Sequence, residues 1–213
     1  MTFEQVKEGN ANKKIYKVTD DAFKCFGKVY DYDTKELIEY ATKNIEVPKI
    51  GDFYQASDAG LESIAVVQTI SEDLFGGLIV QAGPCTGHNQ ALTGFEYHQG
   101  SEVVIAVTDC VLILGKRENM EGNTYQGEKA ELFYVKKGQV VELYGTTLHY
   151  TPCKVDDFFM TVVLLLKGTN EALDKPIGIC RKKNKYFIAH SSQTEKIKVG
   201  NYPGLLGELI FIQ

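Results

Sequence analysis

The stretch "GFEYHQGSEVVIAV", residues 94–107, combines the pattern of two β-strands and a turn with three side chains that can bind a metal. Its β-branched and aromatic residues favour strands, and Gly100 within "QGS" allows the chain to reverse between them. Glu96, His98 and Glu102 nevertheless lie within this strand-forming sequence. Two carboxylates and an imidazole therefore stand where the sequence otherwise predicts a core.

The spacing of these residues predicts that they face one another. Residues two apart in a strand point to the same face, so Glu96 and His98 can project together into a barrel interior. The reversal brings Glu102 near His98 at the start of the next strand. A second segment, "KKGQVVELYGTTLHYTPC", adds His149 after a strand and a "YGTT" turn. Four oxygen and nitrogen ligands on rigid strands suit a divalent transition metal such as zinc, manganese, iron or nickel.

A purely structural interpretation applies to each residue taken alone. A single His98 or Glu102 would more often be a hydrogen-bonded core group or an exposed strand residue. Two carboxylates buried near each other without a cation, however, would repel and carry a large desolvation penalty. A bound cation or a cationic substrate is the more economical explanation of the set.

Beyond Pro48, the surrounding sequence is a series of short runs rich in Val, Ile, Leu, Tyr and Phe. Turn residues such as "SED", "VTDC", "KKGQ" and "KVDD" separate most of them. About ten strands without alternating helices predict a mainly β protein, a sandwich or barrel of jelly-roll type. The expected strands are 63–69, 77–82, 91–97, 102–107, 111–115, 130–135, 140–144, 158–166, 177–180, 186–189 and 209–212.

Helical patterns occur only near the N-terminus. "TDDAFKCFG" predicts a single turn that ends at Gly27, and "DTKELIEYATKN" predicts a helix capped by Asp33. The polar segment 116–129 has no periodicity and predicts a surface loop. We expect one domain over 1–213, with short helices up to about residue 60 and a barrel core with C-terminal strands over about 61–213.

The composition limits the possible partners. The chain has 213 residues, 44% of them hydrophobic, and a net charge of −5, which argues against binding a phosphate backbone. The basic run "RKKNK", 181–185, predicts a solvated hairpin turn. No apolar segment resembles a signal peptide or approaches the length needed to span a bilayer, so we expect a cytoplasmic protein that binds neither nucleic acid nor membrane. The five cysteines lack C-x-x-C spacing, which indicates neither a disulfide framework nor a thiolate zinc site.

The segment "EYHQGSE" resembles the first metal-binding motif of the cupins, in which two histidines at i and i+2 are followed by a glutamate. Glu96 occupies the first histidine position, His98 the second and Glu102 the glutamate position. "GQVVELYGTTLH" resembles the second cupin motif, with a glycine eleven residues before the last histidine, His149. The resemblance implies a double-stranded β-helix, or jelly-roll barrel, that holds a metal at these four residues.

Glutamate at the first motif position is similar to the ureidoglycolate lyase branch of the cupins. "KVTDDAFKCFGKVYD" is similar to that branch's "T-x-x-A-F-x-P-F-G" segment, with Cys25 in place of proline. "LHYTP" is similar to its "WHHP", with Tyr150 in place of the second histidine. The resemblance covers roughly 15–166, and Tyr150, Glu102 and the extra length indicate a divergent member.

The resemblance implies an enzyme that acts on a small molecule. A metal site of this kind would serve a lyase acting on a hydroxy acid or ureide, or a sugar isomerase, with Glu96, Glu102 or Tyr150 moving the proton. His88 in the Gly-rich loop "GPCTGHNQ" is a candidate substrate contact. The alternative is a non-catalytic cupin that binds a small sugar or acid as a sensor or store. A homodimer is expected, because small jelly-roll cupins usually bury an apolar sheet face or edge between subunits.

Overall fold

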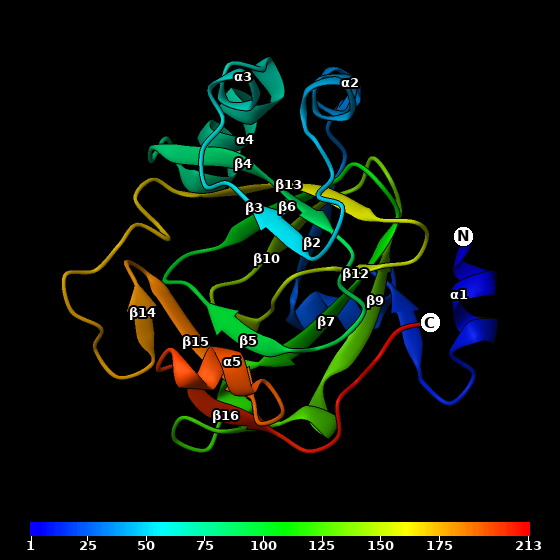
Figure 1. The fold of residues 1–213 in the computed structure, drawn as a ribbon. Coiled ribbons are helices and arrows are strands. Elements are labelled where there is room, and N and C mark those ends of the chain that lie inside the picture. The colour runs from blue at the N-terminus through cyan, green and yellow to red at the C-terminus, as the bar shows by residue number, and fades with distance from the viewer.

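A two-sheeted β-barrel forms the centre of the computed structural model, which describes residues 1–213 (Figure 1). Helices lie over one outer face of the barrel, and a third sheet lies on another side (Figure 1). The fold is mainly β with short helices, and the predicted jelly-roll barrel is confirmed. None of the helices combines the length and the apolar character needed to cross a bilayer.

The first barrel sheet contains strand β6, the second half of the opening stretch. In spatial order its strands are β2 (Gly27–Tyr30), β10 (Val140–Leu143), β6 (Glu102–Ala106), β13 (Phe159–Leu166), β4 (Val80–Gly87) and β3 (Asp52–Tyr54). All neighbours are antiparallel. In β6, Val104 packs inside the barrel, whereas Val103 and Ile105 pack beneath the helices. Because both faces are buried, this strand is continuously apolar rather than alternating.

The second barrel sheet closes the interior. Its strands are β1 (Ile15–Lys17), β9 (Glu131–Val135), β7 (Cys110–Lys116) and β11 (Thr147–Leu148), and β12 (Cys153–Lys154) also pairs with β7. Inside, the Phe133 ring lies 5.3 Å from that of Phe23 and 5.1 Å from that of Phe26. Phe23 belongs to the 3-10 helix η1 (Asp21–Cys25), which is the short helical turn predicted in this segment.

Three helices cover the outer face of the first sheet: α2 (Lys35–Asn44), α3 (Ala59–Glu62) and α4 (Ala65–Phe75). The strand predicted at 63–69 is wrong, because most of that segment belongs to α4. Its β-branched residues suggested a strand, but Val67, Ile70 and Leu74 recur at helical spacing and face the sheet. Gly76, with φ 60°, ends this helix. The N-terminal helix α1 (Phe3–Gly9) was not predicted.

The third sheet joins the C-terminal strands to the opening stretch. It contains β14 (Cys180–Lys182), β15 (Lys185–His190), β16 (Tyr202–Leu206) and β8 (Tyr125–Gln126), and β5 (Gly94–Tyr97) pairs with β15. Between β15 and β16 lies α5 (Thr194–Lys198), so helices are not confined to the region near the N-terminus, as the sequence predicted. Side chains of the third sheet pack against the outer face of the second barrel sheet.

The segment 116–129 is more ordered than the predicted surface loop. It contains β8 and two 3-10 helices, η2 (Arg117–Asn119) and η3 (Gly127–Lys129). Tyr125 is only 1% exposed, and its ring packs edge-on against Phe95 at 5.2 Å. Because most residues of the segment are polar, its sequence gave no indication that Tyr125 is one of the largest buried side chains of the core.

Candidate metal centre

The four side chains predicted to bind a metal lie at neighbouring strand ends. Glu96 belongs to β5, Glu102 begins β6, and His98 lies in the turn between them. Gly100, in the connection between β5 and β6, has φ 103°, which favours glycine. The two strands do not pair with each other as a hairpin, because β5 belongs to the third sheet and β6 to the first. His149 follows β11 and forms two backbone hydrogen bonds with Glu96: Glu96 N to His149 O at 2.7 Å and His149 N to Glu96 O at 2.9 Å. The fold therefore brings the four residues together.

Their side-chain atoms converge on one point. His149 Nε2 lies 3.2 Å from Glu102 Oε2, and His98 Nε2 lies 3.5 Å from the same oxygen. His98 Nε2 is also 3.8 Å from Glu96 Oε1. Ligand atoms of Glu96, His98 and His149 all lie within 4.8 Å of one another, close enough to share one ion. The most exposed of the four side chains, Glu96, is only 12% exposed.

Each imidazole is held by a backbone carbonyl on its far side. His98 Nδ1 lies 2.6 Å from the Asn184 carbonyl oxygen, and His149 Nδ1 lies 3.0 Å from the Thr147 carbonyl oxygen. A carbonyl oxygen only accepts, so Nδ1 carries the proton and donates in both rings, and Nε2 faces the carboxylates. Such outer hydrogen bonds orient histidine ligands in metal sites.

The charges at the site depend on one another. Burial alone would raise the pKa of Glu102, but His149 and His98 outweigh it and hold that pKa well below its usual range. Burial alone would lower the pKa of His149, but Glu102 outweighs it and raises the pKa to about 9. The space between Glu102 and His149 Nε2 therefore favours a positive charge, either a proton or a metal ion.

Lys185 is a site residue that the sequence reasoning missed. It begins β15, which pairs with β5, and its ammonium group forms an ion pair with the Glu96 carboxylate. Burial raises the pKa of Glu96, but nearby positive charge, first that of Lys185, lowers it overall. The Lys185 side chain is only 20% exposed, so the solvated turn expected for 181–185 is wrong at this position.

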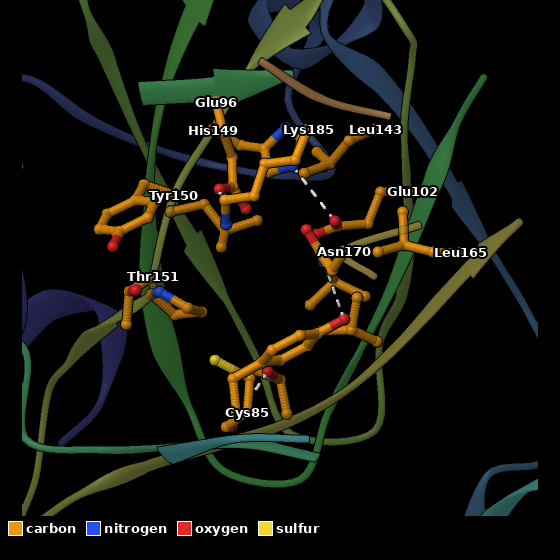
Figure 2. Close-up of a pocket in the computed structure, with 16 residues that line it drawn as sticks. Cys85, Glu96, Glu102, Leu143, His149, Tyr150, Thr151, Leu165, Asn170 and Lys185 are labelled. Carbon is orange, nitrogen blue, oxygen red and sulfur yellow. Dashed lines mark hydrogen bonds and ion pairs between the residues drawn. The ribbon is translucent and has the colours of Figure 1, made fainter. Parts of the chain in front are cut away.

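The site borders a cavity of about 110 Å³ inside the barrel (Figure 2). Glu96, Glu102, His149 and Lys185 form its charged part. The remaining wall is largely apolar and includes Val104, Leu112, Leu143, Val163 and Leu165. A small cavity with a few convergent polar groups in a largely apolar wall is typical of a small-molecule site.

Two neutral polar side chains also line the cavity and were not predicted. Asn170 Nδ2 donates a hydrogen bond to Tyr54 Oη at 3.1 Å, while Asn170 Oδ1 is buried without a hydrogen-bond partner. Tyr54 belongs to β3, and Asn170, with φ 71°, lies in the loop after β13. They lie far apart in the sequence, and no motif pointed to either.

Tyr150, a predicted proton-transfer residue, lines the cavity beside His149. Its hydroxyl group lies 3.3 Å from the ammonium group of Lys196 in α5. Figure 2 shows its ring pointing away from Glu102. The phenol therefore points away from Glu102, and its part in proton transfer stays a prediction.

His88 does not line the cavity. Its Nε2 lies 2.8 Å from the Pro48 carbonyl oxygen, and its Nδ1 lies 3.0 Å from that of Asp157. Because both ring nitrogens contact backbone, this geometry gives the histidine a structural role between loops. The expected substrate contact by His88 is therefore not supported.

The donor set fits a divalent transition metal. His98 Nε2 is buried without a hydrogen-bond partner, and its lone pair faces the Glu102 carboxylate. Two such electron-rich groups repel unless a cation lies between them. Two imidazole nitrogens and two carboxylates match the preferences of zinc, manganese, iron or nickel. The buried group of Glu96, His98 and His149, with Glu102 beside it, could hold one such ion.

The jelly-roll barrel, with histidine and glutamate side chains converging from its strand ends, is the arrangement that the resemblance to the cupins implied. Residues 15–210 match the family model described as "Domain of unknown function (DUF4867)", and the chain belongs to that family. No curated protein matches it.

Several solved structures are similar to parts of the chain. A cupin-like protein from Thermotoga maritima is 14% identical over 44% of this chain and 61% of its own, with a TM-score of 0.29. A cupin domain from Bordetella pertussis is 16% identical over 41% of this chain and 81% of its own, with a TM-score of 0.30. An oxalate decarboxylase is 13% identical over 45% of this chain and 24% of its own, with a TM-score of 0.31. The match thus spans less than two thirds of the decarboxylase and of the Thermotoga maritima protein.

Proposed function

We propose that this chain is a metal-dependent cupin enzyme, a lyase or isomerase that acts on a small hydroxy acid, ureide or sugar-like substrate, with chemistry similar to that of ureidoglycolate lyases. The observation that carries the proposal is the convergence of two backbone-oriented imidazoles and two buried carboxylates at the edge of a small cavity. A homodimer and a cytoplasmic location are part of the same proposal.

Four residues, Glu96, His98, Glu102 and His149, would hold the metal, which would supply Lewis-acid activation of a substrate hydroxyl group. In the lyase reaction, a carboxylate oxygen of Glu96 or Glu102 takes the hydroxyl proton. The C–O bond then becomes a carbonyl as the C–N bond to the leaving urea breaks. The departing nitrogen needs a proton, which Tyr150 or the newly protonated carboxyl group supplies.

An isomerase would use the same groups differently. The carboxylate would move a proton between adjacent carbons of a hydroxy-ketone, with both oxygens held at the site. The small cavity favours a short substrate over a hexose. We therefore place the lyase first.

A non-catalytic binding protein is the second candidate, and the ion pairs favour it. Glu96 pairs with Lys185, and Glu102 lies 3.2 Å from His149 Nε2, so a protonated His149 would balance the site without a metal. Such a pocket could hold a polar ligand by direct hydrogen bonds. A pocket that only binds a ligand does not need two carboxylates placed to accept a proton, so we prefer the enzyme.

A substrate screen tests the proposal. Protein loaded in turn with zinc, manganese, iron or nickel is incubated with hydroxy acids, ureides, pentoses and hexoses, and products are followed by NMR. We expect turnover of at least one compound, and its loss in His98→Ala. Ligand binding without turnover for every metal and compound would favour the binding protein.

A further inference from the structure

Lys185 is the only lysine or arginine among the residues that line the cavity. Its ammonium group pairs with Glu96 and lies 5.8 Å from the ring centres of both Tyr150 and Phe187. No hydrogen bond to backbone fixes the ammonium group. A lysine side chain is a flexible four-carbon arm, so this group can turn from Glu96 toward the cavity without movement of the strand.

The net charge of the metal-loaded site is positive. Two carboxylates, the ammonium group of Lys185 and a divalent cation, with both imidazoles as neutral ligands, sum to one positive charge. Because burying an uncompensated charge is unfavourable, the metal-loaded pocket favours a ligand that carries one negative charge.

A metal ion would also change the partner of Lys185. An ammonium group and a metal compete for the same Glu96 carboxylate, and a divalent ion is the stronger partner. The released ammonium group would face the cavity, whose wall also carries the neutral polar groups of Asn170 and Tyr54. A carboxylate in the cavity is the partner that such a group would bind.

Resting on the proposed metal site, we propose that Lys185 is a substrate-binding residue that selects monoanionic carboxylic acids. It neutralises Glu96 in the metal-free protein and binds the carboxylate of the ligand once a divalent metal occupies the site. This narrows the substrate class to hydroxy acids and acidic ureides and sets neutral sugars aside.

Two matched ligands and two matched variants test the assignment. Glycolate is a 2-hydroxy acid with one negative charge, and glycolamide is its neutral counterpart of nearly the same shape. Lys185→Met keeps the length of the side chain and removes its charge. Lys196→Met is the control, because Lys196 also contacts Tyr150 but does not line the cavity.

The first measurement is Mn²⁺ binding by calorimetry with no ligand present. Removal of the competing ammonium group should tighten Mn²⁺ binding about tenfold in Lys185→Met, whereas Lys196→Met should match the wild type. Equal or weaker Mn²⁺ binding in Lys185→Met would overturn the competition for Glu96. If the wild type bound no Mn²⁺, Zn²⁺, Fe²⁺ or Ni²⁺, the metal site itself would be wrong and this assignment with it.

The second measurement is ligand binding to the Mn²⁺-loaded proteins. We expect the wild type and Lys196→Met to prefer glycolate over glycolamide about tenfold or more, and Lys185→Met to lose most of that preference. A preference for glycolate that survives in Lys185→Met would overturn the assignment and leave the metal site standing. Equal binding of glycolate and glycolamide by the metal-loaded wild type would also overturn the assignment of Lys185 and leave the metal site standing.

Discussion

His149 Nε2 lies 3.2 Å from Glu102 Oε2, although 47 positions separate the two residues in the chain. Both are buried, and His149 is oriented by the Thr147 carbonyl oxygen on its other ring nitrogen. A buried carboxylate beside an imidazole that presents its lone pair defines a place for a cation. This pair therefore links the geometry of the barrel to the proposed metal.

Replacing Glu102 with glutamine keeps the shape of the side chain and removes its charge. We expect the affinity for Zn²⁺ or Mn²⁺ to fall about tenfold to hundredfold, measured by competition with a chromogenic chelator. Glu171→Gln is the control, since Glu171 is an exposed carboxylate paired with Lys183 outside the site. Unchanged affinity in Glu102→Gln would exclude this carboxylate as a ligand.

Lys196 should make stability depend on pH in a defined window. Burial lowers the pKa of Lys196 from 10.5 to about 8. The charges of Asp52, Glu96 and Lys185 also affect this pKa, but each by less than burial does. The unfolded chain then binds more protons than the folded chain between these two values, so the free energy of unfolding rises with pH there. The destabilising effect of the buried charge is fully present below pH 8.

Urea unfolding of the wild type and Lys196→Met at about pH 7 and about pH 9.5 measures this effect. The free energy of unfolding of the wild type, relative to the variant, should increase at the higher pH. A relative stability that stays constant or falls would show that the Lys196 pKa is not lowered.

Substitution of Tyr125 tests whether the segment 116–129 is part of the core. Its ring is buried against Phe95, and its hydroxyl group donates to the Lys129 carbonyl oxygen at 3.0 Å. Tyr125→Ala should lower the free energy of unfolding by about 3–5 kcal/mol. Tyr202→Ala, at a side chain that is 43% exposed, should change it by about 0.5 kcal/mol or less. Similar losses in the two variants would contradict the packing.

The sequence was sufficient to predict the β-barrel and the convergence of the four proposed metal ligands. Glu96, His98 and Glu102 lie within seven residues of sequence, on the end of one strand, a short connection and the start of the next strand, so local sequence is sufficient to place them together. Lys185 was missed because its approach to Glu96 depends on the pairing of β15 with β5, two segments almost ninety positions apart. No local pattern encodes that pairing. Local β-propensity also misassigned α4, whose apolar face is fixed by packing against the sheet.

The predicted homodimer can be tested at an exposed edge of the barrel. Strand β3 is the end strand of the first sheet, and Phe53 on it is 41% exposed. Light scattering at micromolar concentration should give the mass of a dimer, and Phe53→Asp should shift it toward a monomer. A monomeric wild type would contradict the homodimer, and a dimeric Phe53→Asp would place the interface elsewhere.

Metal content is the most direct test of the central claim. Wild type, His98→Ala, His149→Ala and the control His88→Ala are purified without added metal, and their elemental composition is measured together with their melting temperatures with and without Zn²⁺, Mn²⁺, Fe²⁺ or Ni²⁺. We predict about one ion per chain and metal-dependent melting in the wild type and His88→Ala, and neither in the two site variants. A wild-type protein without stoichiometric metal, whose melting temperature no added ion changes, would contradict the metal centre.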